Sequence, residues 1–210
     1  MNPLLLNNIF YILETTAIFS FALSGMIAAK RKNFDPVGTY VIACVTAFGG
    51  GTLRDVILDV QPVYWISHPE YPAIIFLFIM FAYLFTFVFK GFHIKEKWLF
   101  IPDSVGISFF AITSAQTAIS LGYPIIIVGI FSTMTACFGG VFCDILCLET
   151  PKIFNRGVSL YASAVFIGAC LYFILHSFFG VSPEINMVVS SLATLSLRFL
   201  AVKFKWRLDF

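Results

Sequence analysis

The chain of 210 residues is 60% hydrophobic and only 11% charged, and its formal net charge at pH 7 is +2. Soluble domains are about half apolar and about a quarter charged, so a mean hydropathy of +0.94 excludes an ordinary soluble fold and indicates that lipid is the solvent. The small net charge also excludes the strongly basic surface that a nucleic-acid partner requires.

Seven apolar stretches follow one another along the chain, each long enough for the roughly 20 residues with which a helix crosses the hydrocarbon core. No stretch alternates in the way that the strands of a membrane barrel require. A basic cluster follows the first stretch and none precedes it, the reverse of a cleavable signal peptide, so we expect this stretch to remain as a helix. We predict an all-α membrane protein with a single transmembrane domain over residues 1–210 and seven helices over 8–29, 37–59, 72–90, 100–121, 124–147, 158–178 and 185–203.

The basic residues determine the predicted orientation of these helices, because short loops that carry Lys and Arg stay on the cytoplasmic side. Alternate connections carry eleven of the thirteen basic residues, and the connections between them carry none. The N-terminus is therefore predicted outside and the C-terminus in the cytoplasm. The residues predicted to lie on the cytoplasmic side are Lys30, Arg31, Lys32, Lys90, Lys95, Lys97, Lys152, Arg156, Lys203, Lys205 and Arg207.

The chain resembles itself when it is shifted by 89 residues, and the matched positions include Gly, Pro and acidic residues rather than apolar filler alone. We predict two three-helix repeats, at about residues 8–91 and 97–180, and an extra helix over 185–203. Because three is odd, the second repeat enters the membrane upside down, an arrangement found in transporters and channels. The matched pairs are Glu14 with Asp103, Phe21 with Phe110, Thr46 with Thr135, Gly50 with Gly139, Gly51 with Gly140, Asp55 with Asp144, Pro62 with Pro151, and Gly91 with Gly180.

Glycine runs lie in the middle of the second and fifth predicted helices. Each glycine costs a helix about 1 kcal/mol relative to alanine, so a run favours a kink or local unwinding. Unwound backbone at membrane depth is tolerated only where it is buried or lines water, so we predict a cation path along these two helices. The alternative is close packing of the helices through small residues. The candidate kink and pore residues are Gly49, Gly50, Gly51, Gly139 and Gly140, with hydroxyls nearby on Thr46, Thr52, Ser132, Thr133 and Thr135.

Apart from the terminal residues of the spans, six charged residues fall inside the predicted helices, where a charge costs several kcal/mol and faces protein or water. Counting about 1.5 Å per helical residue places them in two groups on opposite sides of the glycines. We predict that the two groups form a charged pathway or gate; the alternative is ion pairing that only stabilises the bundle. The outer cluster is Glu14, Arg54 and Asp55, and the inner cluster is Asp103, Asp144 and Arg198.

Three segments, Phe21–Gly25, Phe48–Asp55 and Phe138–Asp144, resemble the prokaryotic branch of the trimeric intracellular cation (TRIC) channel family. That branch overlaps a bacterial membrane-protein family labelled as glycine transporters, and the resemblance covers nearly the whole chain. It implies a homotrimer in the bacterial cytoplasmic (inner) membrane, with one pore inside each subunit between the second and fifth helices, kinked at their glycines. It also implies passive permeation of K+ and Na+. The basic residues of the fourth helix that give animal members voltage response and lipid control have no counterpart in residues 104–121, so neither property is expected.

Two functions from different classes remain open on the sequence. A cation channel would use carbonyl, hydroxyl and carboxylate oxygens to replace the water around K+ or Na+. A secondary transporter of glycine or another small amino acid would hold the substrate carboxylate at a helix N-terminus or with Arg54. An enzyme is not expected, because the sequence has no Ser-His-Asp set and no Cys/His metal-ligand spacing. We expect no cofactor beyond permeant cations and bound lipid, and as partners only membrane lipids and other copies of the chain.

Overall fold

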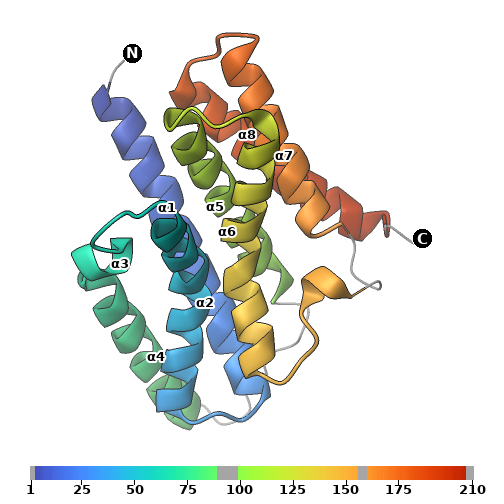
Figure 1. The fold of residues 1–210 in the computed structure, drawn as a ribbon. Helices are drawn as coiled ribbons and strands as arrows, with labels where there is room; N and C mark the ends of the chain where they lie inside the picture. Colours follow the sequence, from blue (N-terminus) through green and yellow to red (C-terminus); the bar gives the residue numbers. More distant parts are fainter. Residues whose placement is uncertain (1–2, 89–98, 156–159, 207–210) are drawn as a thin grey trace.

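The computed structural model describes residues 3–88, 99–155 and 160–206. Within these ranges all regular structure is helical, which confirms the all-α class (Figure 1). The elements in chain order are α1 (Pro3–Arg31), α2 (Pro36–Ile57), α3 (Tyr64–Ser67), α4 (Glu70–Val88), α5 (Phe100–Ser120), α6 (Ile125–Leu146), the 3-10 turn η2 (Lys152–Phe154), α7 (Ala162–Ser177) and α8 (Pro183–Lys203).

Each of the seven predicted stretches corresponds to one long helix, with bounds that agree to within a few residues. By length and composition α1, α2, α6 and α8 can cross a membrane, and α4 and α7 contain shorter apolar runs. The short helix α3 was not predicted, because its four residues are too few to give an apolar period. Some predicted positions lie outside the described residues, namely 89–90, Gly91, Lys95, Lys97, Arg156, 158–159 and Arg207.

The backbone repeats itself at the same shift of 89 residues. α2 and α6 begin 89 residues apart and end 89 residues apart. Backbone φ is positive just after each of these helices, at Asp59 and Leu148, and in the loop before each of them, at Asn33 and Gly122. Figure 1 shows α1 and α5 running in opposite directions, as do α2 and α6. These local features support the predicted upside-down duplication.

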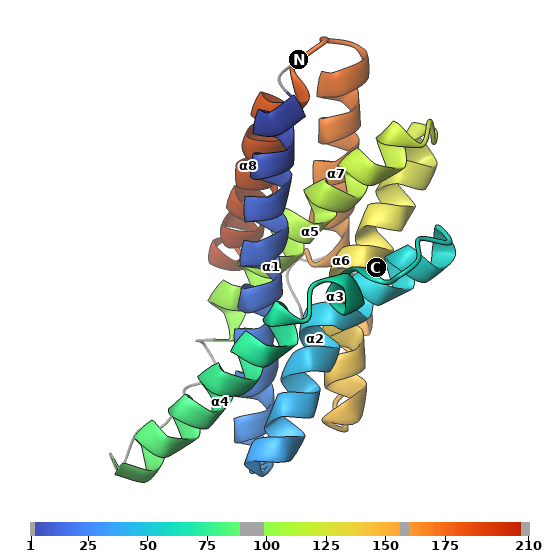
Figure 2. The same ribbon diagram turned by 90° about the vertical axis from the view of Figure 1, so that its left-hand side faces the viewer.

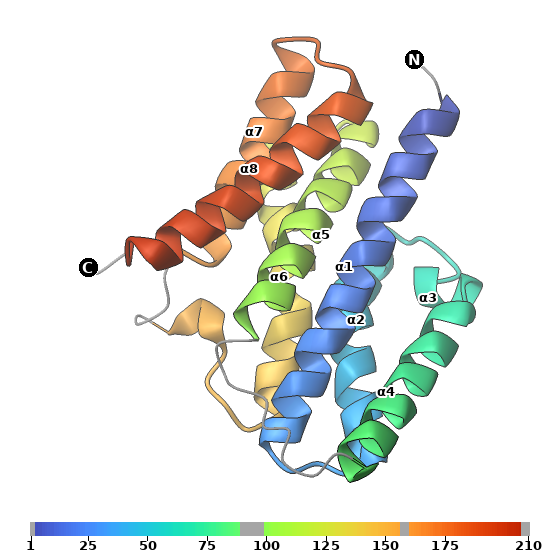
Figure 3. The ribbon, with the colours of Figure 1, turned by 180° about the vertical axis from the view of Figure 1, so that it is seen from behind.

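The centre of the molecule consists of α1, α2, α5 and α6. Both α1 and α6 pack against α2 and against α5. α4 lies on one side of this group, against α2, while α7 and α8 lie on the other side, against α5 (Figures 2 and 3). The central helices therefore carry all the predicted site residues except Arg198, which α8 brings in from outside the two repeats.

Side chains on α8 are distributed as expected for a helix between lipid and a polar protein interior. Its exposed side carries apolar residues such as Ile185 and Leu192, whereas Ser190, Thr194 and Arg198 are buried. This is the reverse of the arrangement in a soluble protein, where the apolar side faces inward. The polar groups of α8 are therefore gathered inside the bundle, where a pathway or an ion-pair network would need them.

Candidate functional site

The outer cluster is held by short ion pairs. Arg54 of α2 donates from Nη1 to Glu14 Oε1 of α1 and from Nε to Asp55 Oδ1, each over 2.9 Å. The second oxygen of Asp55 accepts a hydrogen bond of 2.9 Å from the backbone N–H of Tyr64, which begins α3. All three charged side chains are buried. The structure thus brings together the three predicted residues and connects α1, α2 and the loop that follows α2.

The inner cluster is more loosely held. Arg198 Nη2 of α8 lies 3.5 Å from Asp103 Oδ2 of α5. The hydroxyl of Tyr161 donates to the other oxygen of Asp103 over 3.5 Å, and the guanidinium of Arg198 lies 4.7 Å from the centre of the Tyr161 ring. Asp144 of α6 accepts a 3.0 Å hydrogen bond from the backbone N–H of Lys152. Asp144 therefore anchors the chain after α6, as Asp55 anchors the chain after α2.

Lys152 belongs with the inner cluster, although the sequence indicated only a cytoplasmic loop residue. Burial lowers the pKa of its ammonium, but the carboxylates of Asp103 and Asp144 outweigh this effect, so the pKa is raised above its ordinary value. One feature of the sequence could have indicated this position. Pro62 matches Pro151, which indicates that the chain turns back in the same way after Asp55 and after Asp144. Lys152 thus adds a positive charge to the electrostatic surroundings of the two inner carboxylates.

One position of the repeat differs in a way that changes the electrostatics. Glu14 and Asp55 have acidic counterparts 89 residues later, but the residue that matches Arg54 is Cys143, which is buried and uncharged. The second repeat therefore lacks an arginine at this place. Arg198 of the extra helix provides the guanidinium instead. This gives α8 a role that the repeat alone does not explain.

The two helices with glycine runs, α2 and α6, meet at Gly50 and Gly139. A Cβ atom at Gly50 would overlap the carbonyl oxygen of Thr135, and one at Gly139 would overlap the carbonyl oxygen of Thr46. The partners are related by the shift of 89 residues, so both repeats make the same contact. The lack of side chains at these glycines lets the two backbones approach closely.

The sequence predicted a kink or local unwinding at the glycines, and the unwinding is not found, because both α2 and α6 are helical without interruption there. α2 does bend part-way along its length (Figure 2). Close packing keeps the hydrogen bonds of each helix intact, so no carbonyl needs to be freed to accommodate the glycines. The crossing therefore has the geometry of the alternative stated for these glycines, which is close packing of two helices through small residues.

The remaining glycines have different surroundings. A Cβ atom at Gly49 would lie 2.8 Å from the ring of Phe142, and one at Gly140 would lie 2.9 Å from the Tyr161 hydroxyl. Gly51 is open, since the nearest atom to such a Cβ is a nitrogen of Arg54 at 4.0 Å. Within the two glycine runs, therefore, only Gly50 and Gly139 require glycine for a contact between backbones.

Most of the candidate hydroxyls are already engaged. Thr46 and Thr133 donate to backbone carbonyl oxygens one turn earlier in their own helices, over 2.6 and 2.7 Å. Thr52 accepts a 3.2 Å hydrogen bond from the indole N–H of Trp65. Ser132 is buried and its hydroxyl has no hydrogen-bond partner among the described residues, and Thr135 is buried on the same helix. Ser132 therefore has its whole hydroxyl available to water or an ion, and Thr52, which accepts one hydrogen bond, keeps a second lone pair.

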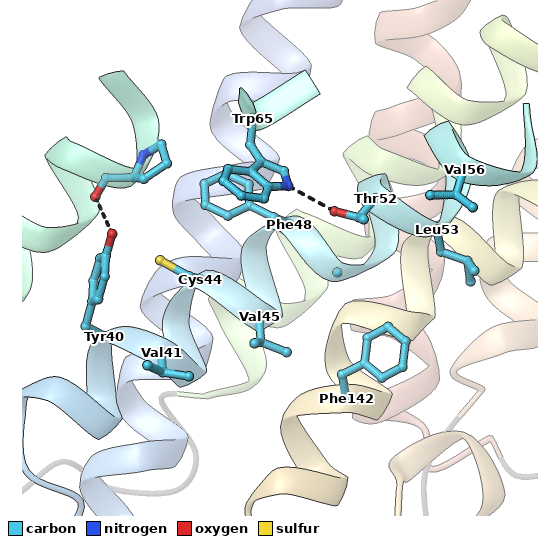
Figure 4. A pocket seen from close by; sticks show the side chains of 12 residues that line it. Tyr40, Val41, Cys44, Val45, Phe48, Thr52, Leu53, Val56, Trp65 and Phe142 are labelled. Carbon is cyan, nitrogen blue, oxygen red and sulfur yellow. Dashed lines mark hydrogen bonds between the residues drawn. The ribbon is translucent and has the colours of Figure 1, made fainter. Parts of the chain in front are cut away.

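Two hollows adjoin this part of α2. A cavity of about 10 Å³ lies beside the outer cluster and is bordered by Glu14, Arg54, Thr52 and Tyr64. A larger groove of about 580 Å³ lies next to it along α2, shares Thr52 and Trp65 with it, and is also bordered by Phe142 (Figure 4). The groove is almost entirely apolar, because the polar groups drawn in it are hydrogen-bonded to one another or to the backbone. Of the two hollows, the small cavity is the one that charged side chains border.

The fold and its buried charged clusters define a multi-pass helical membrane protein with a polar interior. Among the described residues, no group of three or more His, Cys, Asp or Glu side chains is arranged to hold a metal ion. The chain belongs to the family described as Glycine transporter, whose pattern matches residues 11–87 and 100–177. The two matched ranges begin 89 residues apart, the same shift that relates the repeated sequence features.

Known relatives place the protein in the bacterial inner membrane. A UPF0126 membrane protein of Vibrio cholerae is 30% identical, over 96% of this chain and 82% of the relative. The UPF0126 inner membrane protein YadS of Escherichia coli (strain K12) is 28% identical, over 94% of each chain. The protein is accordingly a multi-pass protein of the bacterial inner membrane.

Solved structures of TRIC channels share this fold, which confirms the resemblance seen in the sequence. One, from work on the structural basis for conductance through TRIC cation channels, is 35% identical with a TM-score of 0.82, over 96% of both chains. A TRIC trimeric intracellular cation channel orthologue from Rhodobacter sphaeroides is 29% identical with a TM-score of 0.82, over 93% of this chain and 98% of that chain. A prokaryotic TRIC channel in 0.5 M KCl, 24% identical with a TM-score of 0.83, matches in fold alone.

Proposed function

We propose that this protein is a homotrimeric channel for monovalent cations, K+ or Na+, with one conduction path inside each subunit. Seven helices would span the membrane, with the N-terminus outside and the C-terminus in the cytoplasm, and the apolar outer faces would contact lipid. The observation that carries the proposal is the pair of buried acidic clusters, one on each side of the glycine crossing. Similarity to TRIC cation channels at 35% and 29% identity supports it.

The conduction path would connect the outer cluster with the inner cluster past the crossing of α2 and α6. Buried carboxylates on both sides favour cations and disfavour anions along such a path. The backbone contacts at Gly50 and Gly139 leave no room for an ion between the two helices. In this proposal the crossing is the closed gate, and conduction requires α2 and α6 to separate there. No chemical step is needed.

The test is electrical recording from the purified protein in planar bilayers. We expect unitary K+ currents that reverse at the potassium equilibrium potential in a KCl gradient. Crosslinking or native mass measurement in the same lipid is expected to give a trimer. Saturable exchange of labelled glycine between the two sides, without unitary currents, would instead establish a carrier and refute the channel.

Transport of glycine is the second candidate, favoured by the description of the family. A carrier would need a cationic group free to hold the substrate carboxylate. Arg54 is already paired with both Glu14 and Asp55 at 2.9 Å, so it has no obvious capacity for a third carboxylate. This arrangement suits neutralisation of an arginine inside a cation path better than capture of an amino acid.

A further inference from the structure

We propose that the outer cluster binds a single monovalent cation, K+ or Na+, between Glu14 Oε2 and the oxygen atoms of the adjoining small cavity. The inference rests on the proposed cation channel, to which it adds a defined binding site. It can nevertheless be tested without any measurement of current.

The first argument is the balance of charge in the outer cluster. Two carboxylates, Glu14 and Asp55, share one guanidinium, that of Arg54, which leaves one negative charge in excess. Both oxygens of Asp55 accept hydrogen bonds, from Arg54 and from the Tyr64 backbone. Only one oxygen of Glu14 is so engaged, whereas Oε2 is buried without a hydrogen-bond partner among the described residues. The excess charge is therefore located at Glu14.

An uncompensated buried charge is costly. Glu14 is 1% exposed, so water outside the protein does little to stabilise its carboxylate. The cluster related to it by the repeat has a second positive group within its influence: Arg198 pairs with Asp103, and the carboxylates of Asp103 and Asp144 raise the pKa of Lys152. The outer cluster differs from its counterpart by one missing positive charge, which a bound cation provides.

The second argument is the adjoining space. The cavity beside Glu14 has a volume of about 10 Å³, the room that one water-sized occupant needs. Its border includes oxygen-bearing side chains of Glu14, Thr52 and Tyr64. Phe48 and Phe110 also border it and limit the water that can enter. Carboxylate and hydroxyl oxygens in a small, partly dry space suit a monovalent cation that has lost part of its hydration shell.

The third argument is access. The Tyr64 hydroxyl lies 3.4 Å from that of Tyr71, which in turn lies 2.8 Å from the Thr15 hydroxyl. Tyr11, whose side chain is half exposed, lies beside Tyr71. These hydroxyls form a line of neutral oxygen atoms from the surface at the N-terminal end of α1 towards the cavity. In this proposal a cation enters along these hydroxyls and exchanges one oxygen ligand for the next.

The experiment uses the full chain in lipid nanodiscs, with Trp98→Phe and Trp206→Phe so that Trp65, which borders the cavity, is the remaining tryptophan. KCl or NaCl is titrated against N-methyl-D-glucamine chloride at constant ionic strength and pH. We expect a saturable change in Trp65 emission and a rise of several degrees in the unfolding midpoint with the small cations only. Glu14→Gln is expected to abolish both responses and to raise the midpoint in the large cation.

Asp103→Asn is the matched control, because it neutralises the repeat counterpart of Glu14, and it is expected to keep the saturable response. Equal responses of the parent protein to small and large cations would overturn the site. A saturable response that persists in Glu14→Gln would overturn it as well. The parent titration decides the question even if Glu14→Gln does not fold. Currents without a saturable response would support the channel and disprove the binding site. A saturable response without currents would support the binding site and disprove the channel.

Discussion

Replacing Gly50 with alanine is expected to lower the free energy of unfolding by about 3 kcal/mol, and Gly139→Ala is expected to do the same. The added Cβ atom would overlap a backbone carbonyl oxygen of the facing helix, that of Thr135 or Thr46. A flexible side chain could turn away from such a contact, but a carbonyl inside a helix cannot, so α2 and α6 must move apart. Thermal unfolding of the purified protein in lipid measures the effect.

Gly51→Ala is the matched control, since it lies in the same glycine run. A Cβ atom there would have its nearest neighbour at 4.0 Å, a nitrogen of Arg54. Alanine also favours a helix over glycine by about 1 kcal/mol, so this variant is expected to be as stable as the parent or slightly more stable. If Gly50→Ala and Gly51→Ala changed stability equally, the effect would come from helix propensity, and the proposed contact between α2 and α6 would be disproved.

Replacing Arg54 with methionine is expected to lower the free energy of unfolding by about 3–5 kcal/mol. The change leaves Glu14 and Asp55 buried together without the guanidinium that now pairs with both at 2.9 Å. Two carboxylates in that position repel each other and have lost the surrounding water. Adding Glu14→Gln to Arg54→Met is expected to restore part of the loss, and a double-mutant cycle measures the coupling.

An exposed ion pair with the same nitrogen–oxygen distance provides a comparison for the outer cluster. Lys32 and Glu149 also lie 2.9 Å apart, but their side chains are 33% and 37% exposed. Water screens this pair, so Lys32→Met is expected to cost less than about 1 kcal/mol. A similar cost for Arg54→Met and Lys32→Met would mean that the outer cluster is hydrated in the folded protein, which contradicts the burial on which its electrostatics depend.

Much of the candidate site could be predicted from the sequence, because a polar residue that recurs 89 positions later is marked as important in both repeats. The match of Glu14 with Asp103 and of Asp55 with Asp144 separated these acids from apolar filler, and depth counting placed them on two sides of the glycines. The structure brings Arg54 to both outer acids and Arg198 to Asp103. Lys152 was missed, because a lysine after a predicted span looks the same whether it faces water or folds back onto an acid.

The function of the glycines was harder to predict. A run of glycines weakens a helix, which favours unwinding, and it also removes side chains, which favours close approach. The local sequence cannot choose between these effects, since the choice depends on whether another backbone is present to occupy the space. In this fold α6 presents the Thr135 carbonyl to Gly50, and α2 presents the Thr46 carbonyl to Gly139.

The sequence by itself predicted the helices and their duplication, because hydropathy and helix length are local properties and a repeat can be read by comparing the chain with itself. The tertiary structure alone decided which faces meet. The rotation and crossing of a helix depend on all its neighbours at once, so the pairing of Arg198 with Asp103, the closed contact of α2 with α6 and the bare oxygen of Glu14 follow from the assembled bundle.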